Sequence, residues 1–314
     1  MADLTLVKPE APSALRRLSD DFLAHCRAKG LSPKTWRDAY RYALDEVFLP
    51  WCAEQGITEP AQLSTRVVER FTTHLLEDGG RRGPLSKASV GSYSRSVRAF
   101  LGWAEKEGEL AERVKVPALK QTRRVLDVLS REEIQAMEDA AKSERDKLLV
   151  RVLADTGLRL GEALGLRAAD IIASGGGRTQ LKVRGKGDQE RLVPLSPALA
   201  RRLARHLRGL KAEGSDRIFV ALRKGPDGRY APLTQSGAEQ AIRTLAVVAG
   251  IERRVYPHLL RHSFATHALR RGMSTIQLQA ILGHSSLTMI AQVYSHLTVD
   301  DAYDAMMALL RSDD

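Results

Sequence analysis

One aperiodic basic segment divides the chain, and it constrains the fold more than any other feature. Residues 116–124 (VPALKQTRR) contain proline and show no apolar periodicity. Residues 13–115 before it carry apolar residues at helical spacing, whereas helical stretches alternate with a hairpin pattern after it. We therefore predict an all-helical domain over residues 13–115, a basic linker over 116–129 and a mainly α second domain with a small β-sheet over 130–314.

The predicted first domain contains four helices, each with an apolar stripe. The first ends at Gly30, the second begins at the cap and proline pair Ser32-Pro33, and the third and fourth begin near Ser64 and Ser86. Their stripes predict the core: Leu15, Leu18, Phe22, Leu23 and Cys26; Trp36, Tyr40, Ala43 and Val47; Val67, Val68, Phe71 and Leu75; Val90, Tyr93, Val97, Phe100 and Leu101. The opposite faces hold Lys34, Arg37, Arg41, Arg95 and Arg98, a pattern that fits phosphate contacts and solvated helix faces equally.

The second domain begins with a helix at Ser130, where Glu133 completes a capping box. Residues 180–184 and 190–194 form the strands of a predicted hairpin around the turn 185–188 (GKGD). We expect a short strand near residues 218–220 to pair with this hairpin. From Ser236 onwards the pattern is helical.

The charge of the chain points to a polyanionic partner. The net charge is +11, and it is unevenly distributed: residues 1–115 have 18 Lys+Arg against 16 Asp+Glu, while the remainder has 31 against 22. Nucleic acid fits this distribution, as does a merely basic surface. There is no run of 18 apolar residues and no signal-peptide pattern at the N-terminus, so we predict no membrane segment. Cys26 and Cys52, two core residues by prediction, fit a reducing cytoplasm.

Five segments of the second domain place polar residues where a simple core would not require them. Each has a local explanation when taken alone. Arg159 and Glu162 are spaced for an intrahelical ion pair, and Gly185-Lys186-Gly187 suits an exposed turn without the spacing of a Walker loop. His258, His262 and His267 lack a carboxylate or cysteine that would complete a zinc site, so we predict no metal. A lone Tyr294 is usually a packing residue.

The order of these segments resembles the tyrosine recombinase family, also called lambda-type integrases, over residues 130–297. TGLRLGEALGL is similar to the family's first-arginine box, VRGKGDQERLVPL to its lysine hairpin, PHLLRHSFATHAL to its His-x-x-Arg box and LQAILGHSS to its second-histidine box. Tyr294 then falls at the place of the nucleophile. The helical first domain more loosely resembles the family's core-binding domain, which is SAM-like.

The resemblance implies a catalytic set of Arg159, Lys186, His258, Arg261, His284 and Tyr294. Two guanidiniums can clamp the non-bridging oxygens of a phosphodiester, and His284 adds a third donor. By resemblance, Lys186 is the general acid for the leaving 5′ oxygen, His258 accepts the proton of Tyr294, and a 3′-phosphotyrosyl intermediate forms. The family needs neither metal nor ATP, so no cofactor is expected.

The resemblance also implies double-stranded DNA as the partner, with a tetramer acting on two sites through a Holliday junction. A second recombinase or a directionality factor is a further partner that the resemblance leaves open. The tail from about Val299, with Leu297, Ala302, Ala305, Met306, Leu309 and Leu310, predicts an amphipathic helix that docks on a neighbouring protomer or on its own domain.

Several alternatives remain open from sequence. The interval from His284 to Tyr294 is ten residues, where many family members have nine, which makes Tyr303 the competing hydroxyl. The longer interval favours a mobile-element integrase, and the expected lack of an arm-binding domain also suits an Xer-type chromosome-dimer resolvase. A type IB topoisomerase-like enzyme and a catalytically silent DNA-binding regulator are the other candidates.

Overall fold

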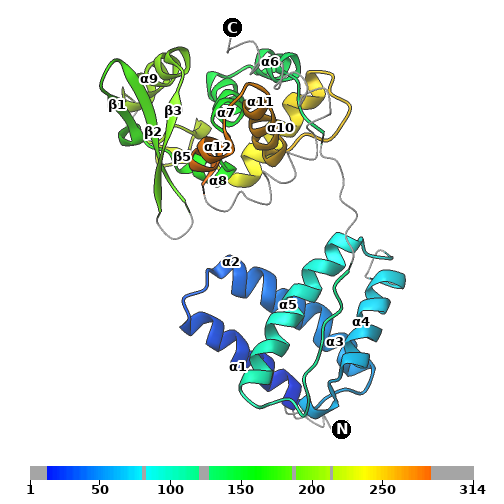
Figure 1. The fold of residues 1–314 in the computed structure, drawn as a ribbon. Helices are drawn as coiled ribbons and strands as arrows, with labels where there is room; N and C mark the ends of the chain where they lie inside the picture. Colours follow the sequence, from blue (N-terminus) through cyan, green and yellow to red (C-terminus); the bar gives the residue numbers. More distant parts are fainter. Residues whose placement is uncertain (1–12, 80–82, 120–126, 186–188, 213–214, 284–314) are drawn as a thin grey trace, which may run out of the picture. The chain divides into compact units, whose positions relative to one another are not determined.

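The computed structural model describes residues 13–79, 83–119, 127–185, 189–212 and 215–283. The chain divides into two compact units, residues 1–123 and 124–314 (Figure 1). Among the described residues, no helix is long and apolar enough to cross a bilayer. Helices dominate both units and the sheets are small, so the predicted fold class, mainly α with a small β-sheet, is confirmed.

The described part of the first unit consists of helices. Serine side chains cap three of them, because Ser13, Ser64 and Ser86 each accept a hydrogen bond from the backbone of the first turn. In order, the helices are α1 (Ala14–Ala28), α2 (Pro33–Thr35), the π-helical η1 (Trp36–Arg41) and η2 (Leu44–Phe48), α3 (Leu49–Glu54), the 3-10 turn η3 (Pro60–Gln62), α4 (Thr65–Glu77) and α5 (Lys87–Lys106).

The core of the first unit follows the predicted stripes of α1, α4 and α5 except at Val67 and Tyr93, which are only partly buried, and both cysteines are buried as expected. The second predicted helix differs. It runs in π-helical geometry through η1 and η2, which rotates the side chains that follow relative to a regular α-helix. Leu44 and Phe48 therefore lie in the core, whereas Trp36, Tyr40 and Val47, predicted to point inward, are only partly buried against it.

Three of the arginines whose pattern fits phosphate contacts and solvated helix faces equally have partners within the unit. Arg37 pairs with Asp38 at 2.9 Å and Arg41 with Asp45 at 3.1 Å. Arg98 donates from Nη2 to the carbonyl of Val116 at 3.1 Å, at the start of the predicted linker. These side chains are exposed, but any phosphate has to compete with an acceptor that is already in place.

The second unit contains both helices and strands. The predicted capping box at Ser130 and Glu133 is present and begins α6. In order, the elements are α6 (Arg131–Ala140), α7 (Glu144–Thr156), α8 (Leu160–Gly165), the 3-10 turn η4 (Ala168–Asp170), β1 (Ile171–Ser174), β2 (Arg178–Arg184), β3 (Glu190–Leu195), α9 (Pro197–Ala212), β4 (Val220–Lys224), β5 (Tyr230–Pro232), α10 (Gln235–Val248), α11 (Pro257–Arg270) and α12 (Thr275–Leu282).

The predicted hairpin is confirmed as β2 and β3, which pair antiparallel with Leu181 opposite Val193. The expectation for residues 218–220 was wrong in its partner. Strand β4 begins at Val220 and pairs with β5 in a separate two-stranded sheet. The third strand of the main sheet is β1, and the strands of that sheet have the order β1-β2-β3. A four-residue strand such as β1 is too short to show a clear alternation of apolar and polar residues, so no local pattern predicted it.

Helix α7 is the central element of this unit. Five of its residues are fully buried: Leu148, Leu149, Val150, Val152 and Leu153. Its neighbours include α6, α9 and α11, and Figure 1 shows α8 and α12 close to its C-terminal end. The end of α7 is therefore where α8, α11 and α12 meet, and the predicted arginine boxes lie there.

Candidate active site

Gly157 makes the meeting of these helices possible. It ends α7 in the left-handed conformation, with φ of 63°. A β-carbon at this position would lie 2.4 Å from Cδ1 of Phe264 and 2.7 Å from Cδ2 of Leu282. Only glycine lets the backbone turn here while α11 and α12 pack this close.

Arg159 lies two residues further on, at the N-cap of α8. Its backbone N–H and its Nη1 both donate to the carboxylate of Glu162, each at 2.9 Å. The ion pair that the spacing predicted is therefore present. The Arg159 side chain remains 39% exposed, so a negatively charged ligand can reach it from solvent.

Arg261 is on α11 and is almost completely buried, at 1% exposed. Its guanidinium donates from Nη1 to the Gly157 carbonyl at 2.6 Å and from Nη2 to the Leu282 carbonyl at 2.8 Å. Its Nε has no hydrogen-bond acceptor among the described residues. Burial, and next the positive charge of Arg159, lower the pKa of Arg261 to about 10. The group stays charged at neutral pH, but its surroundings favour an added anion.

His258 precedes Arg261 by one turn, at the start of α11. Its ring reaches solvent, yet the surrounding protein desolvates it enough to lower its pKa, and the charges of Arg261 and Arg159 lower it further. A histidine with a lowered pKa is neutral at pH 7, and a neutral imidazole can accept a proton.

The remaining predicted residues, Lys186, His284 and Tyr294, lie outside the described residues. The structure does place the chain next to two of them. Gly185 donates to the Gln189 carbonyl at 2.8 Å across the hairpin end, and Gly283 caps α12. Of the predicted set, the structure thus brings together Arg159, His258 and Arg261.

The two other histidines of α11, His262 and His267, contact the interior of the second unit or its backbone. His262 is buried, and Nε2 of His267 lies 2.8 Å from the carbonyl of Leu129. The backbone N–H of Leu129 also donates to the hydroxyl of Ser263 at 2.8 Å. Helix α11 therefore binds both the N–H and the carbonyl of Leu129, the last residue of the predicted linker. Within the described ranges, no cluster of His, Cys, Asp and Glu is suited to a metal ion.

Arg191 on β3 is a site residue that was not among those predicted. Its side chain is 13% exposed and makes two contacts with Glu162, at 3.1 and 2.7 Å. Strand alternation offered a signal, because Arg191 shares its face with the buried Val193 and Leu195. A charged residue on the core face of a strand requires a buried partner.

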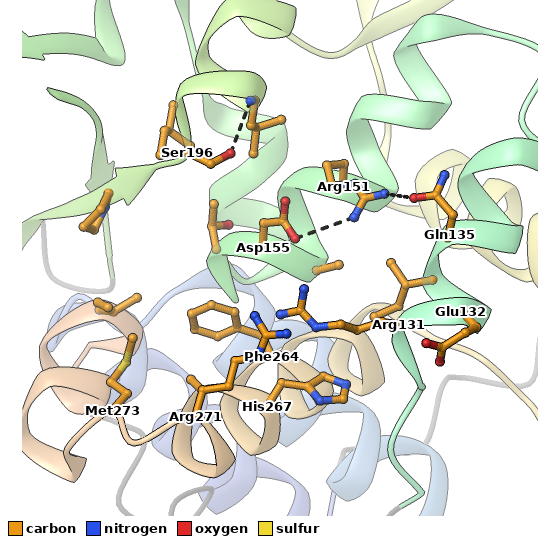
Figure 2. Close-up of a pocket in the computed structure, with 18 of the residues that line it drawn as sticks. Arg131, Glu132, Gln135, Arg151, Asp155, Ser196, Phe264, His267, Arg271 and Met273 are labelled. Atoms are coloured by element: carbon orange, nitrogen blue, oxygen red, sulfur yellow. Dashed lines mark hydrogen bonds and ion pairs between the residues drawn. The ribbon is translucent and has the colours of Figure 1, made fainter. Parts of the chain in front are cut away.

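A separate cavity of 1260 Å³ lies among α6, α7, α11 and α12. Figure 2 shows Phe264 and Met273 in it, with the basic side chains Arg131, Arg151 and Arg271 around them. Its lining does not include Arg159, His258 or Arg261. The cavity is thus distinct from the arginine site.

Comparisons with known proteins identify the family of the chain. Residues 127–300 match the model of the phage integrase family. The chain is 31% identical over 306 residues to the tyrosine recombinase XerD of Corynebacterium glutamicum, and the match covers 91% of this chain and 95% of that protein.

Two solved structures show the same fold. A XerH site-specific recombinase in a post-cleavage complex with palindromic difH DNA has a TM-score of 0.70 at 22% identity, covering 92% of this chain and 84% of that one. A lambda integrase tetramer bound to a Holliday junction has a TM-score of 0.65 at 17% identity, covering 86% and 77%. The family match spans more than half of the chain and the XerD match nearly all of it, so the protein belongs to the phage integrase family and is a tyrosine recombinase.

Proposed function

We propose that the protein is a site-specific DNA recombinase that binds the scissile phosphate between Arg159 and Arg261. The observation that carries this proposal is the environment of Arg261. A buried guanidinium with an unpaired Nε stands beside a second arginine, and the two positive charges repel each other. Glu162 neutralises only part of this positive charge, and a phosphate diester supplies an acceptor and further negative charge.

The cleavage step then uses the remaining predicted residues. The hydroxyl oxygen of Tyr294 attacks phosphorus, the bond from phosphorus to the 5′ oxygen breaks, and a 3′-phosphotyrosyl ester forms. His258 takes the tyrosine proton, and Lys186 gives a proton to the leaving oxygen. Arg159, Arg261 and His284 donate to the non-bridging oxygens, where charge builds up. The ester conserves the energy of the broken bond, so the reverse reaction rejoins a strand without ATP.

A nicked suicide substrate tests the nucleophile. When the nick lets the cleaved end diffuse away, a covalent protein–DNA adduct accumulates and is visible on a denaturing gel. We expect the adduct with the unaltered protein, with or without EDTA, and with the matched variant Tyr303→Phe. Tyr294→Phe should form none. An adduct that persists in Tyr294→Phe and disappears in Tyr303→Phe would move the nucleophile to the tail.

The suicide substrate excludes one of the two other biochemical candidates, and a supercoiled plasmid distinguishes the second. A silent DNA-binding regulator forms no adduct. A type IB topoisomerase-like enzyme forms one but relaxes supercoiled plasmid without joining two sites. We expect junction intermediates when two sites are present. DNA affinity should also fall steeply with salt, because each neutralised phosphate releases counterions.

The biological role is a choice between two proposals. The ten-residue interval between His284 and Tyr294 favours a mobile-element integrase. The similarity to a protein named XerD along nearly its whole length favours an Xer-type resolvase. Two plasmids would distinguish these proposals, one carrying the inverted repeats from the ends of a flanking element and the other carrying two copies of a chromosomal repeat. The plasmid whose two sites recombine identifies the role, and each is tested with this protein alone and with a second recombinase added.

We further propose that four copies assemble on two DNA sites. The lambda integrase that shares this fold supports the proposal, since it forms a tetramer on a Holliday junction. The cavity of Figure 2 suits the predicted tail of another copy. Apolar side chains such as Phe264 and Met273 match its apolar stripe. The lining carries both acidic and basic side chains, and the basic ones, Arg131 and Arg271, can pair with Asp300, Asp301 and Asp304.

Removal of residues 299–314 tests this assembly. We expect the shortened protein to bind one DNA site normally and to form few junctions. Arg271→Glu should weaken junction formation in the same direction. Unchanged junction yield in both variants would refute the docking of the tail in this cavity.

A further inference from the structure

The Arg191 side chain connects three parts of the second unit that each carry or adjoin a predicted catalytic residue. Arg191 belongs to β3, which pairs with β2, and Lys186 lies between these two strands in the sequence. Its Nη1 and Nη2 contact the two carboxylate oxygens of Glu162, at 3.1 and 2.7 Å. Its Nε donates to the carbonyl of Ile281, near the end of α12, at 2.6 Å. The nitrogens of one guanidinium thus join β3, α8 and α12.

The guanidinium of Arg191 lies within van der Waals range of two backbone positions that precede predicted catalytic residues. A β-carbon added to Gly185 or to Gly283 would lie 3.7 Å from Nη1 of Arg191. Gly185 directly precedes Lys186, and Gly283 directly precedes His284. The Arg191 guanidinium therefore adjoins the residues before the proposed general acid and before the proposed third phosphate donor.

The charges around Glu162 give Arg191 a second role. The Glu162 side chain is 7% exposed and accepts hydrogen bonds from both Arg191 and Arg159. Burial acts to raise the pKa of Glu162, but the hydrogen bonds and charges of the two arginines outweigh it, and the pKa lies below its usual value. Glu162 is therefore ionised. Together the three side chains carry a net charge of +1, which is available to attract a phosphate.

Without Arg191, the carboxylate of Glu162 would neutralise Arg159 alone. The local net charge would fall from +1 to zero, and the hairpin would lose its link to α8 and α12. We infer that Arg191 is a positioning residue, which holds Glu162, the Lys186 hairpin and the end of α12 in one arrangement and keeps the charge of Arg159 available to phosphate. It acts through these groups without touching the DNA. This inference rests on the proposed function.

The test compares two suicide substrates under single turnover at saturating DNA. One has the normal 5′ oxygen at the scissile bond and the other a bridging 5′ sulfur, a leaving group that needs no proton. For Arg191→Gln we expect cleavage of the oxygen substrate to slow by about 100-fold, the scale of a displaced catalytic group. The sulfur substrate should recover at least about tenfold of this loss, because the position of Lys186 no longer matters. Arg159→Ala should recover nothing.

Arg202→Gln is the matched control. Arg202, on α9, also bonds two carboxylates, those of Glu138 and Glu144, in the same unit and away from the arginine site. It should lower thermal stability like Arg191→Gln and cleave both substrates at the rate of the unaltered protein. If Arg191→Gln does not fold, Arg191→Lys serves, since it keeps the charge but cannot make all three contacts.

Two results would overturn the inference. Cleavage of the oxygen substrate by the folded Arg191 variants at the unaltered rate would show that Arg191 positions nothing. Equal losses on both substrates, shared by Arg202→Gln, would show a general stability effect. A failure of the proposed function looks different, because the unaltered protein would then form no adduct on either substrate, whatever residue stands at position 191.

Discussion

Replacing Gly157 with alanine should damage both the stability and the chemistry of the second unit. Two costs can be worked out from the structure. A non-glycine residue in the left-handed region costs about 1–2 kcal/mol. The new β-carbon also meets Phe264 at 2.4 Å and Leu282 at 2.7 Å, an overpacking that typically costs about 1–3 kcal/mol. Together they predict a loss of about 2–5 kcal/mol in the free energy of unfolding.

The measurement is urea unfolding followed by far-UV circular dichroism. With a dependence of about 2 kcal/mol per molar urea, the expected loss lowers the midpoint of the second unit by about 1–2.5 M. The fluorescence of Trp36, Trp51 and Trp103 serves as an internal reference, since all three tryptophans belong to the first unit. Cleavage of the suicide substrate should also slow, because the Gly157 carbonyl accepts a hydrogen bond from Arg261.

Gly161→Ala is the control from the same segment. Gly161 lies within α8 with open space around its α-carbon, so alanine should stabilise the helix by about 0.5–1 kcal/mol. Equal midpoints for Gly157→Ala and Gly161→Ala would refute the argument from close packing and left-handed geometry.

Three further outcomes are expected. The lowered pKa of His258 places the acid limb of the cleavage-rate profile below about pH 6.5, and the rate falls as the pH falls. A limb centred above about pH 7 in single-turnover assays would contradict the role of His258 as proton acceptor. Arg261→Lys should slow cleavage by about 100- to 1000-fold, because lysine cannot reproduce the planar pattern of donors, and DNA binding measured alongside should change much less. The hydrogen bond from Arg253 holds the pKa of Glu133 below its usual value. The stability that ionised Glu133 contributes is therefore complete above about pH 4.3 and is lost as the pH falls through the lower folded-state pKa. Glu133→Gln should lose less stability than the unaltered protein over this acid range when unfolding is followed against pH.

Local signals in the sequence were sufficient for much of the fold. The capping box at Ser130 and the hairpin around residues 185–188 depend on neighbours within a few residues, and both are present. The pairing of β4 with β5, and the presence of β1, depend on how strands of three to five residues meet in space. Such short strands have little periodicity, so their partners could not be assigned from sequence.

The candidate site shows the same division. The chemistry of Arg159, His258 and Arg261 was suggested by residue type and order, and the structure brings these three together. The burial of Arg261 and its bonds to two backbone carbonyls could not be anticipated, because they depend on the ends of α7 and α12 meeting. The alternation of β3 places Arg191 on the core face, but its partner Glu162 lies on another element, so the contact itself could not be assigned from sequence.

The crowding of positive charge at Arg261 has a consequence for the free protein. Burial and the charges of Arg159 and Arg191 lower the pKa of Arg261, so by linkage an oxyanion that binds beside these guanidiniums raises the unfolding temperature of the free protein. Under the proposed function, part of the free energy of binding the scissile phosphate is thus the relief of a repulsion already present in the free protein. The unliganded site is electrostatically strained, and this strain favours the bound state before any contact with a base is made.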